Sequence, residues 1–197
     1  MCVYVVMLML CLLSFLNGWD HDVVAALVGL KTINEFDDVL RLVKRQEEGE
    51  QNFFEMLGEI ERDELKAPQI IYITGGTGKG KTYKAYKLAL SNYPKEDIGK
   101  LTLKNNFFDV INESAKCFII EEFRPSQITA SDFLQLTDKY GYRANIKGGF
   151  VSLRPEMLII CSIKPPEEIY KDEVNQQFLR RITKRIDLNT IDPDATV

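Results

Sequence analysis

The sequence predicts an α/β fold in which helices cover both faces of an open parallel sheet. An apolar, β-branched run at 70–74 is followed directly by a glycine-rich segment, and then by a helix-forming run without Gly or Pro from Lys81 to Asn92. Further along, the apolar runs 116–120 and 157–161 have the length and composition of buried strands. Alternating strands and helices around a glycine loop are typical of a three-layer sandwich with a parallel central sheet.

The glycine-rich segment has the form G-x-x-x-x-G-K-T, the pattern of a phosphate-binding loop (P-loop, Walker A). Its residues are Gly75, Gly76, Thr77, Gly78, Lys79, Gly80, Lys81 and Thr82. Glycines let backbone N–H groups turn inward around a polyphosphate, and the following helix adds its unpaired N–H groups. Lys81 is predicted to reach the β- and γ-phosphates of ATP, and the Thr82 hydroxyl to hold Mg²⁺. The alternative is a chance match in a flexible turn, which the flanking strand and helix disfavour.

Composition limits the class of protein. The chain has 197 residues, 45% of them hydrophobic, which suits one core domain with a small appendage. The net charge of −4 is not that of a whole-chain nucleic-acid binder, so such a role requires a local basic patch. His21 is the only histidine, which excludes metal sites built from two histidines. The four cysteines form no C-x-x-C pair, and we expect buried, reduced thiols in a reducing compartment.

The first part of the chain divides into an apolar segment, 1–19, and a helical region, 20–67. Residues 1–16 carry no charge, but they are fewer than the ~20 residues that a membrane-spanning helix needs. We keep three interpretations of them: a membrane contact, a helix packed on the domain, and a misplaced translation start. In the helical region, apolar residues recur at helical spacing in three groups, the last being Phe53, Phe54, Leu57 and Ile60. Ala67-Pro68 ends this pattern, and the predicted ATPase domain covers 68–197.

Hydrolysis of a bound nucleotide needs an acid that holds metal and a group that orients water. The run Cys117 to Ile120 is followed by Glu121 and Glu122, and a bend at the end of the strand lets both carboxylates face one cleft. We predict that Glu121 lies toward Mg²⁺ and Glu122 toward the attacking water. The alternative is a pair of solvated carboxylates at the end of a strand.

Two later segments of the chain carry basic residues. Lys147-Gly148-Gly149 lies between Arg143–Ile146 and Phe150–Leu153, a pattern that predicts a β-hairpin. The segment Val174 to Arg185 is predicted to be a helix with a basic end. Its Arg180 and Arg181 are candidates for an arginine that stabilises the γ-phosphate of a neighbouring subunit. Ordinary surface arginines are the alternative.

The order of these segments resembles that of a known family. The segments GGTGKGKT, FIIEEF, LQLTDKYGYRANIKGGFVSLRPEMLIICSIKPPEEIY and FLRRIT are similar to the helicase domain of replication-initiator (Rep) proteins. Those proteins belong to helicase superfamily 3 and come from viruses with small circular single-stranded DNA genomes and from related plasmids. The resemblance covers about residues 68–190. The phosphate loop is shared by many families, whereas the Lys-Gly-Gly hairpin, strand and Pro-Pro-Glu-Glu sequence are far more specific.

The resemblance implies an AAA+-like superfamily 3 ATPase that uses ATP and Mg²⁺ to act as a DNA helicase or translocase. Such domains work as homo-hexamers on single-stranded DNA, and 20–67 would be the oligomerisation region. Lys147, at the hairpin tip, would touch DNA phosphate in the central channel. Arg180 or Arg181 would be the arginine finger, and Glu121 with Glu122 the acidic motif.

Two departures from the family pattern limit this interpretation. The family's polar sensor, on the strand between the loop strand and the acid strand, usually ends in Ser-Asn, but here Ile163 follows Ser162, so the role falls to Ser162 or Lys164. A Ser in a loop before prolines is the ordinary alternative. Family members also carry a nicking domain with paired histidines and a nucleophilic tyrosine, and this chain has only His21. We therefore expect no nicking endonuclease activity.

Three other functions remain as alternatives. The first is a nucleotide-binding remnant of a Rep protein that unwinds nothing, which Ile163 favours. The second is a membrane-associated ATPase that acts on RNA, with 1–16 as its anchor. The third is a small kinase, but that class usually has an arginine-rich lid, which is not evident in the sequence. For a viral or virus-derived protein we expect the host nucleus, and otherwise the cytoplasm.

Overall fold

The structure, a computed structural model, describes residues 33–104, 107–147 and 149–190. The chain divides into two compact units, 1–51 and 52–197. In the first unit the described residues form the beginning of one long helix, α3 (Ile33–Glu61), as its helical apolar spacing predicts. The second unit contains the end of α3 and the α/β sandwich. The earlier part of the predicted helical region, and the apolar segment 1–16, lie outside the described residues.

A six-stranded mixed sheet forms the centre of the second unit, in the order β3-β2-β4-β7-β1-β8. The prediction of a mostly parallel sheet is confirmed, because β2, β4, β7, β1 and β8 run parallel and only the edge strand β3 is antiparallel to its neighbour. The strands are β1 (Gln69–Thr74), β2 (Ile98–Lys104), β3 (Phe107–Ile111), β4 (Cys117–Ile120), β7 (Met157–Ser162) and β8 (Ile182–Asp187).

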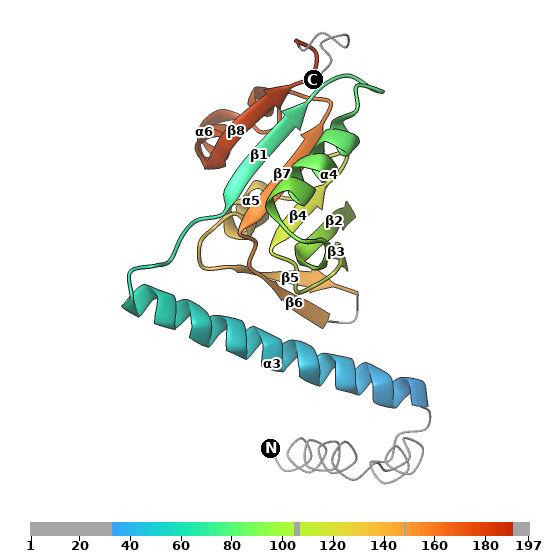
Figure 1. Cartoon of the computed structure of the whole chain (residues 1–197), viewed down its shortest axis with the longest axis vertical. Helices are drawn as coiled ribbons and strands as arrows, with labels where there is room; N and C mark the ends of the chain where they lie inside the picture. The colour runs from blue at the N-terminus through green and yellow to red at the C-terminus, as the bar shows by residue number, and fades with distance from the viewer. Residues whose placement is uncertain (1–32, 105–106, 148, 191–197) are drawn as a thin grey trace. The chain divides into compact units, whose positions relative to one another are not determined.

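Helices cover both faces of this sheet, with α4 (Lys81–Asn92) on one side and α5 (Ala130–Leu136) and α6 (Asp172–Arg181) on the other (Figure 1). Side chains that alternate along each strand create two separate cores. On the α4 side, Ile71 and Ile73 pack with Ala85 and Ala89. On the opposite side, Tyr72 packs in a cluster with the rings of α5 and α6.

Short elements complete the second unit. A 3₁₀ turn, η1 (Lys95–Asp97), leads into β2, and a second, η2 (Pro166–Glu168), follows the Pro165-Pro166 pair. A separate two-stranded sheet is formed by β5 (Tyr142–Ile146) and β6 (Gly149–Leu153). Its antiparallel register pairs Ile146 with Gly149, so the predicted hairpin around Lys147 is confirmed.

The predicted helix from Val174 to Arg185 is wrong in its last four residues, 182–185. Helix α6 ends at Arg181, and the following residues form β8, which pairs in parallel with β1. The segment includes the β-branched residues Ile182, Thr183 and Ile186, which favour a strand. The Thr183 hydroxyl also donates a hydrogen bond to the Ile70 carbonyl at 2.8 Å. Pairing with the open edge of β1 therefore overrides the continuation of a helix.

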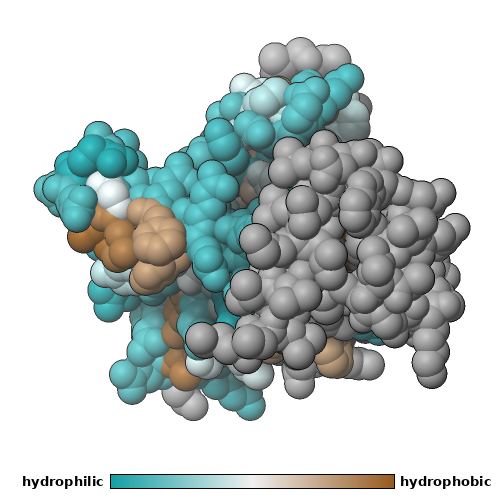
Figure 2. Space-filling model, turned by 90° about the horizontal axis from the view of Figure 1, so that it is seen from below, coloured by the Kyte–Doolittle hydropathy of each residue, from teal (hydrophilic) through white to brown (hydrophobic). Residues whose placement is uncertain are grey.

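The surface of the described residues is mostly hydrophilic in the view of Figure 2, with small apolar patches between the polar groups. Among described residues, Phe53 and Phe54 on α3, Phe107 on β3 and Phe150 on β6 are exposed by 41–67%. No described helix is both long enough and apolar enough to cross a membrane.

Cys117 and Cys161 are free, buried thiols, as expected. Burial raises their pKa values to about 11 and about 12.

Candidate nucleotide-binding site

The predicted loop and the predicted acidic pair leave the sheet at the same edge, the carboxyl end of the parallel strands. Strand β1 ends at Thr74, which pairs with Ser162 of β7. Ile120, the last residue of β4, pairs with Ile160 of the same strand. Strand β7 therefore lies between the loop strand and the acid strand, separating them by two strand spacings, ~10 Å. Open α/β sheets bind their ligands in this position.

The glycine loop has a conformation that depends on two of its glycines. Gly78 and Gly80 have φ angles of 78° and 77°, in the left-handed region that side chains disfavour. A Cβ atom at either position would meet nothing within 4 Å, so the space beside them is open. Gly75 is constrained differently, because a Cβ there would lie 3.1 Å from the Cβ of Leu188. The left-handed backbone, and not a lack of space, is therefore what favours glycine at positions 78 and 80.

Lys81 begins α4 and is buried, with 7% of its surface exposed. Its Nζ donates hydrogen bonds to the carbonyl oxygens of Gly75 and Gly76, both at 2.8 Å. The ammonium group is therefore held against its own loop. Thr82, in the first turn of α4, is exposed.

The loop is tied to β8, a connection that the sequence did not suggest. The Gly76 N–H donates to Oδ1 of Asn189 at 2.9 Å, and the Leu188 N–H donates to the Thr74 carbonyl at 2.9 Å. Asn189 lies 113 positions along the chain from Gly76, and it reaches the loop because β8 pairs with β1. No local motif marks Asn189 in the sequence.

Glu121 is held by side chains from two neighbouring elements. Its Oε1 accepts a hydrogen bond from the Tyr86 hydroxyl of α4 at 3.0 Å and lies 3.1 Å from Nζ of Lys100 of β2. About a quarter of the Glu121 side chain is exposed, 24%. Burial, together with the hydrogen bond to Glu121, raises the pKa of Tyr86 to about 12. Tyr86 and Lys100 were not identified from the sequence, because their contacts with Glu121 depend on which helix and strand lie beside β4.

Glu122 differs from Glu121 in exposure and in backbone conformation. It is exposed and has a φ angle of 53°, in the left-handed region. For a non-glycine residue such a conformation costs on the order of 1–3 kcal/mol and is concentrated at functional sites. The next residue, Phe123, is buried, and its N–H donates to the Cys161 carbonyl at 2.8 Å. The bend predicted at the end of the strand is therefore present at Glu122.

The thiol of Cys161 links β7 to the start of α4. Its Sγ donates to the Lys81 carbonyl at 3.6 Å. Burial is the largest cause of its raised pKa, and the nearby charge of Glu121 adds to it, whereas Lys81 opposes it. The thiol of Cys161 therefore lies against the first residue of α4, behind the predicted loop.

Ser162 ends β7 and is fully buried. Its hydroxyl donates to the Phe123 carbonyl at 2.9 Å and accepts from the Lys164 N–H at 3.1 Å. These bonds connect the β7 end to the segment after the acidic pair. The next residue, Ile163, has 45% of its surface exposed. The sensor role of Ser162 or Lys164 stays a prediction.

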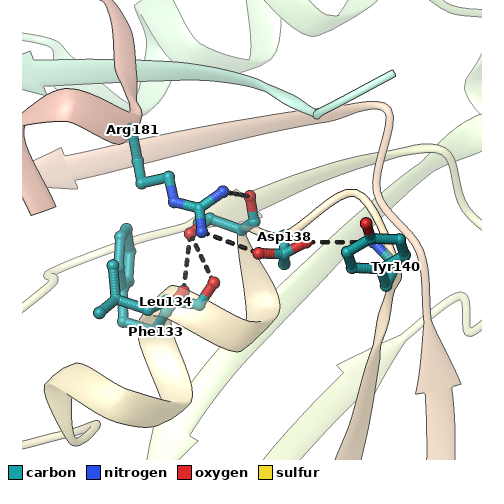
Figure 3. Close-up of polar contacts among 6 residues, drawn as sticks. Phe133, Leu134, Asp138, Tyr140 and Arg181 are labelled. Carbon is teal, nitrogen blue, oxygen red and sulfur yellow. Dashed lines mark hydrogen bonds and ion pairs between the residues drawn. The ribbon is translucent and has the colours of Figure 1, made fainter. Parts of the chain in front are cut away.

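The two candidate arginines have different surroundings. Arg181 donates to Oδ2 of Asp138 at 2.8 Å and to the Thr137 carbonyl at 3.3 Å (Figure 3). The Thr137 hydroxyl in turn donates to the Phe133 carbonyl, so this network joins α6 to the end of α5. Arg180 is exposed, and no ion pair involves it among residues 33–104, 107–147 and 149–190.

Thr82 and Glu121 offer the oxygen donors that Mg²⁺ prefers, a hydroxyl and a carboxylate. Within the described parts of the chain, no group of three or more His, Cys, Asp or Glu side chains is arranged to hold a metal. Lys147, the remaining predicted contact, is exposed in the β5–β6 turn.

No family model matches the chain. It is 30% identical over 118 residues to a replication-associated protein of Pigeon circovirus, covering 59% of this chain and 34% of that protein. It is 26% identical over 169 residues to a replication-associated protein of Beak and feather disease virus, covering 85% of this chain and 55% of that protein. The chain therefore spans between about a third and about half of the length of these relatives.

The solved structures that resemble the chain include two of Hsp104, one from an S. cerevisiae Hsp104–ADP complex and one from a closed state of Hsp104 with ATPγS and casein. Both are 13% identical in sequence, with a TM-score of 0.39, and cover 85% of this chain. The chain covers 32% and 37% of those two chains.

Proposed function

We propose that the chain is a Rep-like, superfamily 3 ATP-dependent DNA helicase or translocase that acts in the replication of a small circular DNA. The observation that carries this proposal is the emergence of Lys81 and the pair Glu121 and Glu122 at one edge of the sheet, on either side of β7. The sequence similarity to circovirus replication-associated proteins supports the role in replication.

In this proposal the protein's own groups bind ATP and orient water. Lys81 exchanges the carbonyls of Gly75 and Gly76 for the β- and γ-phosphates, since a phosphate oxygen is a stronger acceptor for an ammonium group. Thr82 and Glu121 would hold Mg²⁺, which neutralises phosphate charge. Glu122, exposed beside them, would orient the attacking water.

The proposed working assembly is a homo-hexamer with nucleotide between neighbouring subunits. Arg180 is favoured over Arg181 as the arginine given to the neighbour, because Arg181 is already paired with Asp138. The face formed by Phe53, Phe54, Leu57 and Ile60 would contribute to the oligomer, since these apolar side chains are 39–67% exposed. Lys147 would contact the phosphates of single-stranded DNA.

One observation favours a second candidate function, a nucleotide-binding remnant without unwinding activity. The Ser162 hydroxyl is buried and already bonded to the backbone, and the exposed residue after it is Ile163 rather than a polar one. A site without a γ-phosphate sensor would bind nucleotide and fail to couple hydrolysis to movement.

The RNA-directed, membrane-associated ATPase remains an alternative. Flotation with liposomes of the chain with and without 1–16 would test it. Residence in the host nucleus is likewise a proposal.

The proposal is tested by ATPase and strand-displacement assays on the Lys81→Ala variant. We expect turnover to fall by roughly 100-fold or more, because a charged group aimed at developing negative charge is removed. Lys87→Ala is the matched control, since Lys87 is an exposed lysine of the same helix. Normal ATPase activity from Lys81→Ala protein would contradict the proposal. ATP binding without strand displacement by the wild-type chain would favour the remnant.

A further inference from the structure

The β5–β6 hairpin has one buried face and one outward face. Its antiparallel register places Asn145 opposite Phe150 and Arg143 opposite Ser152. The buried face consists of apolar residues, Ala144, Ile146, Val151 and Leu153. The outward face therefore carries a guanidinium, an amide, a hydroxyl and one aromatic ring.

Phe150 is the exception on this outward face. Solvent-facing positions of an antiparallel pair are ordinarily polar, but 48% of Phe150 is exposed. The Arg143 guanidinium lies over the ring, 4.6 Å from its centroid. A cation over an aromatic ring at an exposed site contributes little to stability, so this pair does not by itself account for an exposed phenylalanine.

The hairpin is also locally basic in an acidic chain. Between Tyr142 and Leu153 there are two cations, Arg143 and Lys147, and no Asp or Glu, although the net charge of the whole chain is −4. Lys147 is exposed in the turn, three positions from Phe150. A basic turn beside an exposed aromatic ring is the combination that binds single-stranded nucleic acid, with cations on the backbone and the ring on a base.

We propose that Phe150 and Arg143 form a stacking site for a base of single-stranded DNA, beside a phosphate held by Lys147. This inference rests on the proposed function, in which the hairpin faces the DNA. Every base has an aromatic face, so stacking holds a strand without reading its sequence. A motor that moves along DNA needs such sequence-independent contact. Arg143 both orients the ring and adds a charge next to the backbone.

The test is equilibrium binding of fluorescein-labelled oligo(dT), followed by fluorescence anisotropy over a series of salt concentrations. Phe150→Ala is expected to weaken binding roughly 5- to 100-fold, the range for the loss of one stacked base. Because no charge is removed, the slope of affinity against salt should not change. Lys147→Ala should weaken binding and lower that slope by about 1. Phe150→Tyr should keep the wild-type affinity.

Two controls isolate stacking. Phe107→Ala removes an exposed phenylalanine from β3, outside the hairpin, and should bind as the wild type does. An oligonucleotide with abasic sites should bind the wild type as weakly as oligo(dT) binds Phe150→Ala, because the stacking partner is missing from the DNA. The same series with oligo(rU) identifies which nucleic acid occupies the site.

The outcomes separate this inference from the proposed function. Tight oligo(dT) binding that is equal in wild type and Phe150→Ala would overturn the stacking site and leave the proposed function standing. A loss of affinity in Phe150→Ala that is confined to oligo(rU) would assign the ring to RNA and overturn the DNA stacking site. A change in the mass of the assembly of Phe150→Ala, measured by light scattering, would assign the ring to a neighbouring copy and would also overturn the stacking site. Absence of any single-stranded DNA binding would overturn both.

Discussion

The two sides of the proposed nucleotide site are built in different ways. On the loop side, Lys81 is held by carbonyls only five and six positions away, and the loop conformation depends on Gly78 and Gly80. On the acid side, Glu121 is held by Tyr86 of α4 and Lys100 of β2. The loop side depends mainly on neighbouring residues, with one distant hydrogen bond from Gly76 to Asn189, whereas the acid side is assembled by the tertiary structure. Substitutions on the loop side should therefore alter mainly nucleotide affinity, and substitutions on the acid side should alter mainly the Mg²⁺ requirement.

Of the three variants that compare the two sides, Gly80→Val, which breaks the local conformation of the loop, should have the largest effect. A β-branched residue strongly disfavours the φ angle of 77° that Gly80 adopts, at a cost on the order of 1–3 kcal/mol. We expect nucleotide affinity to fall roughly 10- to 100-fold, measured by fluorescence titration with a labelled ATP analogue. Gly58→Ala, in the helix α3, is the matched control and should bind normally. Wild-type affinity from Gly80→Val would mean that the loop does not need this conformation.

A smaller effect is expected on the acid side from Lys100→Met. The variant removes the cation that lies 3.1 Å from Glu121 and keeps the length of the side chain. Lys100 and Mg²⁺ would compete for one carboxylate, so the Mg²⁺ concentration for half-maximal nucleotide binding should fall about 3- to 5-fold. This magnitude corresponds to a partly exposed ion pair that contributes about 1 kcal/mol. Titration of Mg²⁺ at a fixed nucleotide concentration measures the midpoint. An unchanged midpoint would show that Lys100 does not oppose the metal.

The smallest expected effect is on stability, from Tyr86→Phe. Loss of the hydrogen bond to Glu121 should lower the free energy of unfolding by about 1 kcal/mol, measured by urea denaturation at neutral pH. The pKa of Tyr86 is raised in the folded state to about 12, above the unfolded value of 10.0. Its contribution is therefore fully present below pH 10 and is lost as pH rises toward 12. Wild-type and variant stabilities should converge over that interval, and a constant difference would contradict the assignment.

The sequence predicted correctly those elements whose conformation depends on neighbouring residues. The run that precedes the loop forms β1, the glycine segment is followed by α4 at Lys81, and the Lys147 turn joins two paired strands. Each of these depends on neighbouring residues, through β-branched composition, glycine conformations or turn chemistry. The roles predicted for Lys81, Glu121 and Lys147 remain to be tested by the variants above.

For other segments the sequence pattern predicted the wrong structure or was not recognised as an element. Val174 to Arg185 has the composition of a basic helix, yet its last part becomes β8 because the edge of β1 offers hydrogen-bond partners from a distant segment. Strands β2 and β3 were not identified, although the polar residues Lys100, Thr102 and Lys104 alternate with Leu101 and Leu103 as they do in a half-buried strand. Lys100 pairs with Glu121, the residue that follows the neighbouring strand β4, and no local stretch of sequence contains this contact.

The sequence by itself determined the order of strand, glycine loop and helix, the acidic pair after an apolar run, and the basic hairpin, because each is a property of adjacent residues. Only the tertiary structure decided which strands are neighbours. That choice put β7 between β1 and β4, brought Asn189 to Gly76, and left Phe150 beneath Arg143 on the outer face of the hairpin. Pairing between distant strands depends on the burial of both sheet faces at once, so it cannot be read from one segment alone.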